Sequence, residues 1–259
     1  MPDLGLQVAL DGAALRLTFD RPNTLNALTV ELMEAATARV EKAATDNAVR
    51  VVVLTGAGRA FSSGADLGDP NDAAKAPTIR TLDAANGLVR AITRVPKPVV
   101  AAVNGLAAGV GCTIALSCDL AVTRQSAYFL LAFANIGLMP DGGATALVPT
   151  AIGRARAARM AMLGERVPAA KALDWGLISH VVDDEAFEGE VKAVVERLAQ
   201  GPTRAYAKTK AAVNAATLGL LEQAHRLERA GQLELFATED FAEGVRAFYE
   251  RRPARFQGR

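Results

Sequence analysis

The sequence predicts an α/β protein whose sheet contains several parallel strands. Two short apolar runs, residues 51–54 and 99–103, lack the polar alternation of a half-exposed strand, so each suits a strand buried on both faces. A glycine-rich loop and a helix-like segment follow each run. This repeating order of buried strands and helices is typical of an α/β fold.

The elements follow this pattern from the N-terminus. Residues 6–10 and 15–19 alternate apolar and polar side chains around an Asp11-Gly12 turn signal, which predicts a hairpin. Thr29 is a suitable N-cap for a helix whose apolar residues recur at helical spacing. A loop from Gly56 to about Pro77 is too long for a simple connection, and loops of this length are commonly functional.

The second half of the pattern is more helical. After a helix over about 78–95 and the strand at 99–103, glycines at 109–111 open another helix, and 120–122 is a short strand. Beyond about Arg154 helical periodicity dominates, interrupted by a strand-like segment at 177–182. Asp119, which follows a predicted helix, is expected to cap or pair locally.

The last 60 or so residues contain helical patterns only. A predicted apolar seam on one helix consists of Leu220, Ala224, Leu227, Gly231 and Leu235. A second seam, on a helix opened by Thr238 or Asp240, consists of Phe241, Val245 and Phe248. Such helices must pack on the core or on another subunit. We therefore predict a core over residues 1–195 and a C-terminal helical oligomerisation region over 196–259.

Composition excludes several classes of protein. The chain has 29 basic and 28 acidic residues and a net charge of +1, without the concentrated basic excess of a nucleic-acid binder. Two histidines cannot make a histidine-rich metal site, and Cys112 and Cys118 lie in an apolar segment where thiols behave as small apolar residues. No signal-peptide pattern and no bilayer-length apolar run is visible, so we expect a soluble, cytoplasmic protein without membrane partners.

Two glycine-rich loops are the first candidates for chemistry. Residues 56–67 and 104–113 each follow a buried strand, and neither matches a phosphate-binding P-loop or a dinucleotide fingerprint. The first exposes a backbone amide near Ala65, and the second leaves unpaired N–H groups at a helix N-terminus. Amides from both loops can converge on one oxygen as an oxyanion hole. The simpler alternative for the first loop is a strand-to-helix connection capped by Asp66.

Motifs along nearly the whole chain resemble the crotonase (enoyl-CoA hydratase/isomerase) superfamily. In the order of that family they are Arg21-Pro22 with Asn26-Ala27-Leu28, Thr55 to Leu67, Pro98 to Asp119, Ile136 to Thr145, Ala172 to Val182, and Glu243 to Phe248. The resemblance implies a spiral core of strand–strand–helix repeats, a C-terminal helical trimerisation region, and a homotrimer or dimer of trimers. It also implies acyl-CoA thioester substrates, with coenzyme A as part of the substrate and no separate cofactor.

The resemblance also implies the positions of the site. The N–H groups of Ala65 and Val110 would form the oxyanion hole, and the Val110 side chain would narrow it. Substrate or CoA contacts would come from Arg21, Ala27, Ser63, Asp66, Leu67, Gly109 and Phe133. For Arg21 a contact with CoA phosphates and a surface ion pair are both open, and Asp66 is expected mainly to hold its loop. The segment 68–77 is expected to cover the acyl tail.

The acid–base group departs from the hydratase pattern. Hydratases of this family use two glutamates, and this chain has Thr113 and Phe133 at those positions. Asp141, in Pro140-Asp141-Gly142-Gly143, occupies the place where isomerase branches of the family carry a catalytic acid, most like epoxyphenylacetyl-CoA isomerases. The alternative is that Asp141 only caps the helix that follows.

These observations predict an enoyl-CoA isomerase with a single base. Asp141 would remove a proton beside the thioester, the enolate would rest in the hole, and Asp141 would return the proton two carbons along. Apolar neighbours such as Phe133, Leu138 and Met139 would raise its pKa. Three alternatives stay open: a hydratase with other water ligands, a dehalogenase-like enzyme with Asp141 as nucleophile, and a non-catalytic acyl-CoA-binding or RNA-binding relative.

Overall fold

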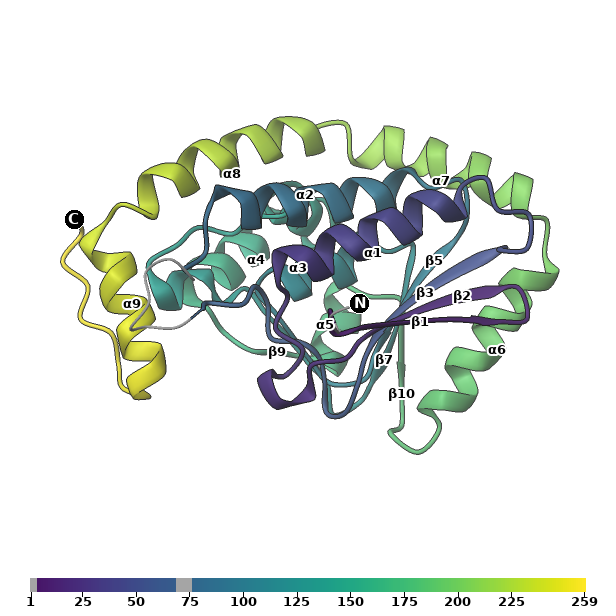
Figure 1. The fold of residues 1–259 in the computed structure, drawn as a ribbon, viewed down its shortest axis with the longest axis horizontal. Helices are drawn as coiled ribbons and strands as arrows, with labels where there is room; N and C mark the ends of the chain where they lie inside the picture. Colours follow the sequence, from purple (N-terminus) through teal and green to yellow (C-terminus); the bar gives the residue numbers. More distant parts are fainter. Residues whose placement is uncertain (1–3, 69–75) are drawn as a thin grey trace.

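The computed structural model describes residues 4–68 and 76–259 and contains two sheets wound into a spiral (Figure 1). The larger sheet has the strand order β1 (Leu6–Asp11), β2 (Ala14–Phe19), β3 (Val51–Gly56), β5 (Val99–Val103), β7 (Leu120–Arg124) and β10 (His180–Val182). The smaller sheet has the order β4 (Ala60–Ser62), β6 (Leu106–Ala108), β8 (Tyr128–Leu130) and β9 (Val167–Pro168).

The helices follow the strands in a regular rotation. They are α1 (Val30–Ala43), α2 (Ile79–Arg94), α3 (Val110–Ser117), α4 (Ala144–Leu163), α5 (Ala169–Trp175), α6 (Phe187–Gln200), α7 (Thr203–Thr217), α8 (Leu221–Leu235) and α9 (Glu239–Glu250), with 3-10 turns η1 (Pro22–Thr24) and η3 (Ala132–Ile136). The units β3–β4–α2, β5–β6–α3 and β7–β8–α4 each add one strand to each sheet and then a helix. The predicted strand–strand–helix spiral is therefore confirmed.

The first elements form as their local sequence requires. β1 and β2 are antiparallel, with Asp11 opposite Ala14 across the turn. The remaining pairs of this sheet, β2–β3, β3–β5, β5–β7 and β7–β10, are parallel. Thr29 caps α1 as predicted, because its hydroxyl accepts a hydrogen bond of 3.2 Å from the Leu32 N–H.

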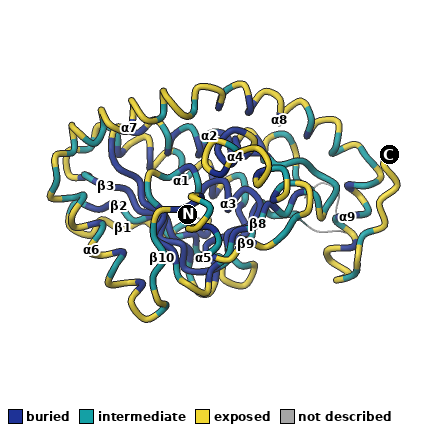
Figure 2. The backbone as a smooth tube through the Cα atoms, turned by 180° about the vertical axis from the view of Figure 1, so that it is seen from behind, coloured by how far each residue is buried: buried dark blue, intermediate teal, exposed yellow. Residues whose placement is uncertain are grey.

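The central strands β3 and β5 of the larger sheet are buried on both faces, which explains their uninterrupted apolar sequences. In β3, Val51 and Val53 face a small core closed by α6, whereas Val52 and Leu54 face the main core. That main core also contains the inner faces of α1 and α2. Figure 2 shows the resulting buried centre with exposed helices around it.

Two local predictions need correction. The smaller sheet was not predicted, because strands of three residues lie within the loops that the glycines define. β10 begins at His180, so the strand is shorter than the predicted 177–182 segment. Leu177 and Ile178 instead bury their side chains in the main core.

The C-terminal helices α7 and α8 run along the outside of the core and α9 turns down beside it (Figure 1). Of the predicted seam on α8, Ala224 is buried, whereas Leu220 and Leu227 are 68% and 62% exposed in the single chain, so the seam as a whole does not face the core. The buried face of α8 consists of Leu221, Ala224, His225, Glu228 and Gln232. This buried face is rotated relative to the predicted seam, because its polar residues contact buried polar groups of the core, as described below.

The second C-terminal prediction is correct only in part. Thr238 caps α9 by accepting a hydrogen bond of 3.1 Å from the Phe241 N–H, and Phe241 is buried. Phe248 is 59% exposed. The predicted boundary at residue 195 falls inside α6, and the division itself stays a prediction. Within the described residues, no helix has both the length and the hydropathy to cross a membrane.

Candidate active site

Two buried asparagines hold the turn at the start of the first glycine loop. Asn26, in the left-handed region with φ of 58°, donates from Nδ2 to the carbonyls of Ala57 and Ala60. Asn104, at the end of β5, donates to the carbonyls of Gly56, Gly58 and Ala60. Together these amides satisfy the carbonyls of a tight turn that would otherwise be buried without donors.

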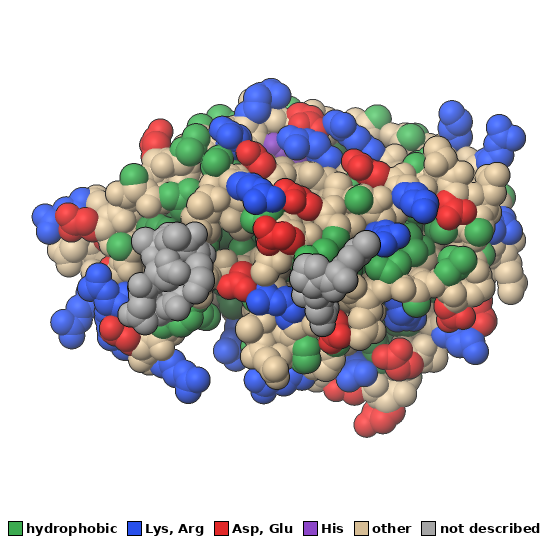
Figure 3. Space-filling model, in the orientation of Figure 1, with side chains coloured by type: hydrophobic (Ala, Val, Ile, Leu, Met, Phe, Trp, Pro, Cys, Tyr) green, Lys and Arg blue, Asp and Glu red, His purple; other side chains and the backbone are tan. Residues whose placement is uncertain are grey.

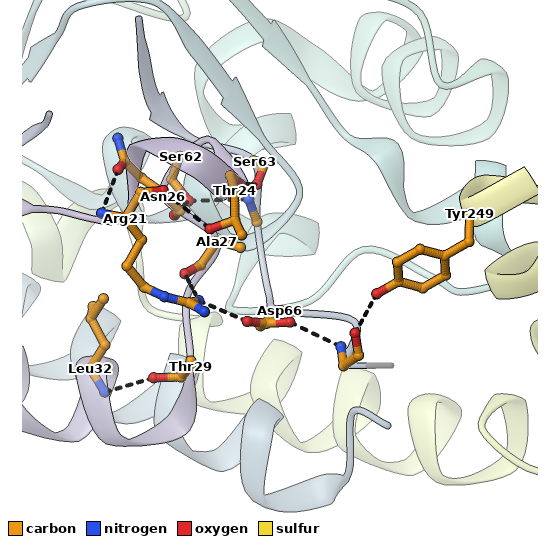
Figure 4. A network of polar contacts seen from close by, with 12 residues as sticks. Arg21, Thr24, Asn26, Ala27, Thr29, Leu32, Ser62, Ser63, Asp66 and Tyr249 are labelled. Carbon is orange, nitrogen blue, oxygen red and sulfur yellow. Dashed lines mark hydrogen bonds and ion pairs between the residues drawn. The ribbon is translucent and has the colours of Figure 1, made fainter. Parts of the chain in front are cut away.

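The segment around η1 then fixes the loop that follows β4 (Figure 4). Leu28 and Ala65 form a one-residue parallel β-bridge. In this bridge the Leu28 N–H donates to Gly64 O, and the Asp66 N–H donates to Leu28 O. The Ser62 hydroxyl donates to Asn26 O and accepts from the Gly64 N–H. In a parallel bridge the N–H of the central residue points away from the partner strand. The Ala65 N–H is therefore turned away from Leu28.

The two glycine loops meet backbone to backbone. Gly64 and Gly109 have φ of 103° and 51°, and a Cβ on Gly64 would lie 3.0 Å from Ala108 O and 3.4 Å from the Gly109 Cα. Only glycines allow this approach and this conformation. The residues that follow them are Ala65 and Val110, the latter at the first position of α3. Within the described part of the chain, neither of their N–H groups donates a hydrogen bond.

Arg21 connects this loop to the C-terminal helix (Figure 4). Its guanidinium donates to Ala27 O at 2.6 Å and to Asp66 Oδ2 at 2.7 Å. Asp66 Oδ1 accepts from the Gly68 N–H, and Gly68 O accepts from the Tyr249 hydroxyl at 2.6 Å. Of the two interpretations of Arg21, the structure contains the ion pair, and Asp66 holds its loop.

The other predicted contact residues surround the same place. Ser63 binds the η1 segment through its N–H and hydroxyl, and Gly109 donates its N–H to Leu130 O. Leu67 is partly exposed beyond Asp66. Phe133 is buried in η3, and its ring lies 4.0 Å from where a Gly109 Cβ would be. The expected cover by segment 68–77 concerns residues 69–75, which lie outside the described residues.

Asp141 lies beside the first turn of α3. Thr113 Oγ1 donates to the Asp141 carbonyl at 3.1 Å, and a Cβ on Gly142 would lie 3.3 Å from the Val110 Cγ2. The side chain is only 9% exposed, and burial raises the pKa of Asp141 from 3.8 to about 7, with a smaller upward contribution from Glu228. Asp141, whose pKa burial raises to about 7, thus lies on a segment that packs against the first turn of α3.

Two residues of α8 hold this acid segment, and the sequence did not indicate either of them. Gln232 Nε2 donates to Asp141 Oδ2 at 2.8 Å and to Met139 O at 3.0 Å. Glu228 accepts from the Gly143 N–H at 2.7 Å, the Thr145 N–H at 2.9 Å and the Thr145 hydroxyl at 2.6 Å. The signal for this face was the spacing of His225, Glu228 and Gln232 on one side of α8, which a solvent-exposed face would equally produce.

The alternative role for Asp141 as a helix cap is wrong. α4 begins at Ala144 with Gly143 at the cap position and no capping side chain from its own segment. Glu228 supplies the carboxylate at this helix terminus instead. The Asp141 carboxylate is thereby free of any capping task.

No carboxylate occupies the two positions that hydratases of the resembled family use. Thr113 is fully buried, and its hydroxyl is engaged with the Asp141 and Gly109 carbonyls. Phe133 is 7% exposed, so it fills its position with apolar volume. Among the described residues, no group of three or more His, Cys, Asp or Glu side chains is arranged to hold a metal ion.

Other polar features lie away from this place. Asp119 does not pair locally as predicted, because it accepts from the Val99 N–H and forms an ion pair of 2.9 Å with Lys210 of α7. A cleft of about 1070 Å³ lies between the ends of α1 and α2 and the start of α7, outside the candidate site. On the face shown in Figure 3, basic and acidic side chains are interspersed.

Comparison with known proteins identifies the class. The family model described as Enoyl-CoA hydratase/isomerase matches residues 11–259, and the chain belongs to this family within the crotonase superfamily. Members of the family are enzymes that act on acyl-CoA thioesters.

Particular relatives bear both activity names. A probable enoyl-CoA hydratase of Rhodobacter capsulatus is 43% identical over 94% of each chain. The 1,2-epoxyphenylacetyl-CoA isomerase of Escherichia coli is 37% identical over 96% of this chain and 97% of its own. The crystal structure of an enoyl-CoA hydratase from Mycobacterium avium subsp. paratuberculosis superposes with a TM-score of 0.92, at 49% identity and with 98% of each chain covered.

Proposed function

We propose that this protein is an enoyl-CoA isomerase in which Asp141 is the single acid–base residue. The observation that carries the proposal is a buried carboxyl with a pKa of about 7 beside the first turn of α3. The hydratase positions on either side hold Thr113 and Phe133, which cannot act as bases. One titratable group therefore has to both remove and return the proton.

The geometry supports a stepwise proton transfer. The thioester carbonyl would accept hydrogen bonds from the Ala65 and Val110 N–H groups, which have no acceptor within the described residues. Ionised Asp141 would take a proton from the carbon next to the thioester carbonyl, and the enolate charge would be stabilised by the two amides. The protonated carboxyl would then deliver that proton two carbons along, which moves the double bond.

The pKa of Asp141 suits both halves of this cycle. A base with a pKa near the working pH is substantially ionised before the reaction and still acidic enough to return its proton. Coenzyme A enters as part of the substrate, and we propose no further cofactor. The Arg21, Ala27, Ser63, Leu67, Gly109 and Phe133 contacts would line the acyl-CoA path.

Asp141→Asn tests the proposal directly. We expect turnover of a 3-enoyl-CoA to its 2-enoyl isomer to fall by about 100- to 10,000-fold, because asparagine cannot accept the proton. Substrate affinity should change little, since the backbone amides are untouched. Unchanged turnover in Asp141→Asn would overturn the proposal.

A hydratase is the second candidate, because the Rhodobacter relative bears that name. Conversion of crotonyl-CoA to its hydroxyacyl product by the unmodified protein distinguishes the two. Isomerisation without hydration supports the proposal, and hydration at a comparable rate favours the second candidate.

We also propose a homotrimer or dimer of trimers in the cytoplasm, with residues 196–259 as the oligomerisation region. Exposed apolar side chains on the C-terminal segments, such as Leu220, Leu227 and Phe248, support this assignment. Light scattering of Leu227→Glu tests it. Loss of the oligomer is the expected result, and a monomeric unmodified protein would contradict it.

A further inference from the structure

We propose that Gln232 of α8 is the positioning residue that orients the Asp141 carboxylate and keeps it able to ionise. This inference rests on the proposed role of Asp141 as the base. Its side chain is fully buried, and its amide donates to Asp141 Oδ2 and to the carbonyl of Met139. One amide group thus holds both the carboxylate and the backbone two residues before it.

The hydrogen-bond pattern fixes which end of the amide faces Asp141. Both neighbours, a carbonyl and a carboxylate, are acceptors, so only the NH₂ end satisfies them. The opposite atom, Gln232 Oε1, is buried without a partner among the described residues. A buried acceptor left unpaired is costly. Gln232 thus uses its amide donor for Asp141 and Met139, at the cost of leaving its own Oε1 unpaired.

The same contact distinguishes the two carboxylate oxygens. Oδ2 is occupied by Gln232, and within the described residues no hydrogen bond reaches Oδ1. The Asp141 backbone is held separately, by the Thr113 hydroxyl on α3. Rotation of the carboxylate is thus limited by a bond at Oδ2. We assign Oδ1 as the atom that takes and returns the proton.

The charged surroundings of Asp141 come from one helix. α8 presents Glu228 and His225 to the segment that follows Asp141, while α3 presents Val110 and Thr113, which do not titrate near neutral pH. The Gln232 bond lowers the pKa of Asp141 against the effect of burial, and the charge of Glu228 raises it. These two neighbours, one turn apart on α8, therefore act in opposite directions.

Because Gln232 and Glu228 shift the pKa of Asp141 in opposite directions, their variants distinguish a positioning role from a merely structural one. The acidic limb of the pH profile of kcat/KM reports the base in the free enzyme. In Gln232→Met, which keeps the volume but removes the donor, we expect this limb to move to higher pH by about one unit. In the matched variant Glu228→Gln, which keeps the shape but removes the charge, it should move to lower pH.

Opposite movements support the inference, because a general loss of packing cannot displace the limb in two directions. An unchanged limb in Gln232→Met, or movement of both variants in the same direction, would overturn it. If Gln232→Met does not fold, Gln232→Asn withdraws the same amide by one methylene and carries the same expectation.

A second measurement separates this inference from the proposed function. Titration of the Asp141 carboxyl carbon by NMR, assigned by its absence in Asp141→Asn, gives the pKa without turnover. If Asp141→Asn remains active but Gln232→Met raises this pKa, the proposed function and the role of Oδ1 in proton transfer fail, whereas the effect of Gln232 on Asp141 stands. If Asp141→Asn is inactive and Gln232→Met leaves the pKa unchanged, only the role of Gln232 fails.

Discussion

The two halves of the candidate site are built in different ways. The oxyanion half uses backbone N–H groups, presented where Gly64 and Gly109 bring two loops together. The acid half uses one carboxylate, whose partner Gln232 lies 91 residues away in the chain. The first half presents backbone atoms only, although the side chains of Asn26, Asn104 and Ser62 hold its loop. The second depends on particular side chains that tertiary packing brings together.

A substitution at Gly64 that adds a side chain should have the largest effect on the oxyanion half. In Gly64→Val the residue would need a φ of 103°, and its Cβ would lie 3.0 Å from Ala108 O. The Ala65 N–H would leave its place, so we expect kcat to fall by about 100-fold or more. Steady-state kinetics with circular dichroism of the folded protein measures this.

Gly189→Ala in α6 is the matched control, because an added Cβ there meets nothing within 4 Å. It should leave both kcat and the fold unchanged. A Gly64→Val variant with the kcat of this control would mean that the Ala65 amide is not part of the site.

The acid half should show itself in stability as well as in activity. The pKa of Asp141 is raised from 3.8 to about 7, so between these values the folded state holds more protons than the unfolded state. Stability contributed by the neutral carboxyl is therefore present in full below about pH 4 and is lost as pH rises to about 7. Asp141→Asn has no carboxyl to ionise and so does not lose this stability. At pH 8 its free energy of unfolding, relative to that of the unmodified protein, should therefore have risen by a few kcal/mol from the value at pH 4.

Urea denaturation at pH 4, 6 and 8 measures the free energy of unfolding of both proteins. The raised pKa of Glu228 affects both curves in the same direction, so their difference reports Asp141 together with its coupling to Glu228. A constant difference across this range would show that folding does not raise the pKa of Asp141, and the acid half would lose its explanation.

The oxyanion half could be predicted from the sequence to a greater extent than the acid half. The strands at 51–54 and 99–103, the Thr29 cap and the two glycine loops depend on local patterns, and the structure contains them. The face of α8 that contacts the core was not predicted, because Glu228 and Gln232 are polar and polar residues on a helix usually face water. Only the buried groups they satisfy, on a segment far away in sequence, explain their position.

Asp119 and the small sheet fail for related reasons. Lys210, the ion-pair partner of Asp119, lies 91 residues away in the chain, so no local pattern could predict that ion pair. β4 and β6 have three residues each, too few for alternation to be visible, and they are strands because they pair with each other. Identification of Asp141 as the acid depended on family resemblance; its apolar neighbours Leu138 and Met139 indicated a raised pKa but not the partner Gln232.

The smallest expected effect concerns the link between Arg21 and Asp66. Their ion pair of 2.7 Å is partly exposed, with side chains 27% and 28% accessible, so a double-mutant cycle should give a coupling below about 1 kcal/mol. If Arg21 acts by holding the loop, Arg21→Ala and Asp66→Ala should raise KM by similar small factors, and the double variant should be no worse.

A direct contact of Arg21 with CoA phosphates makes a different prediction. Arg21→Ala alone would then raise KM, because Asp66 would contribute nothing to a phosphate. Arg39→Ala, at an exposed position of α1, controls for the loss of one positive charge. The Arg21 bond to Ala27 O survives in Asp66→Ala, so equal effects of the two single variants would locate the function in the ion pair. The Arg21–Asp66 pair would then join Asn26, Asn104 and Ser62 among the side chains that hold the oxyanion loop, and the distinction from the acid half would be one of degree.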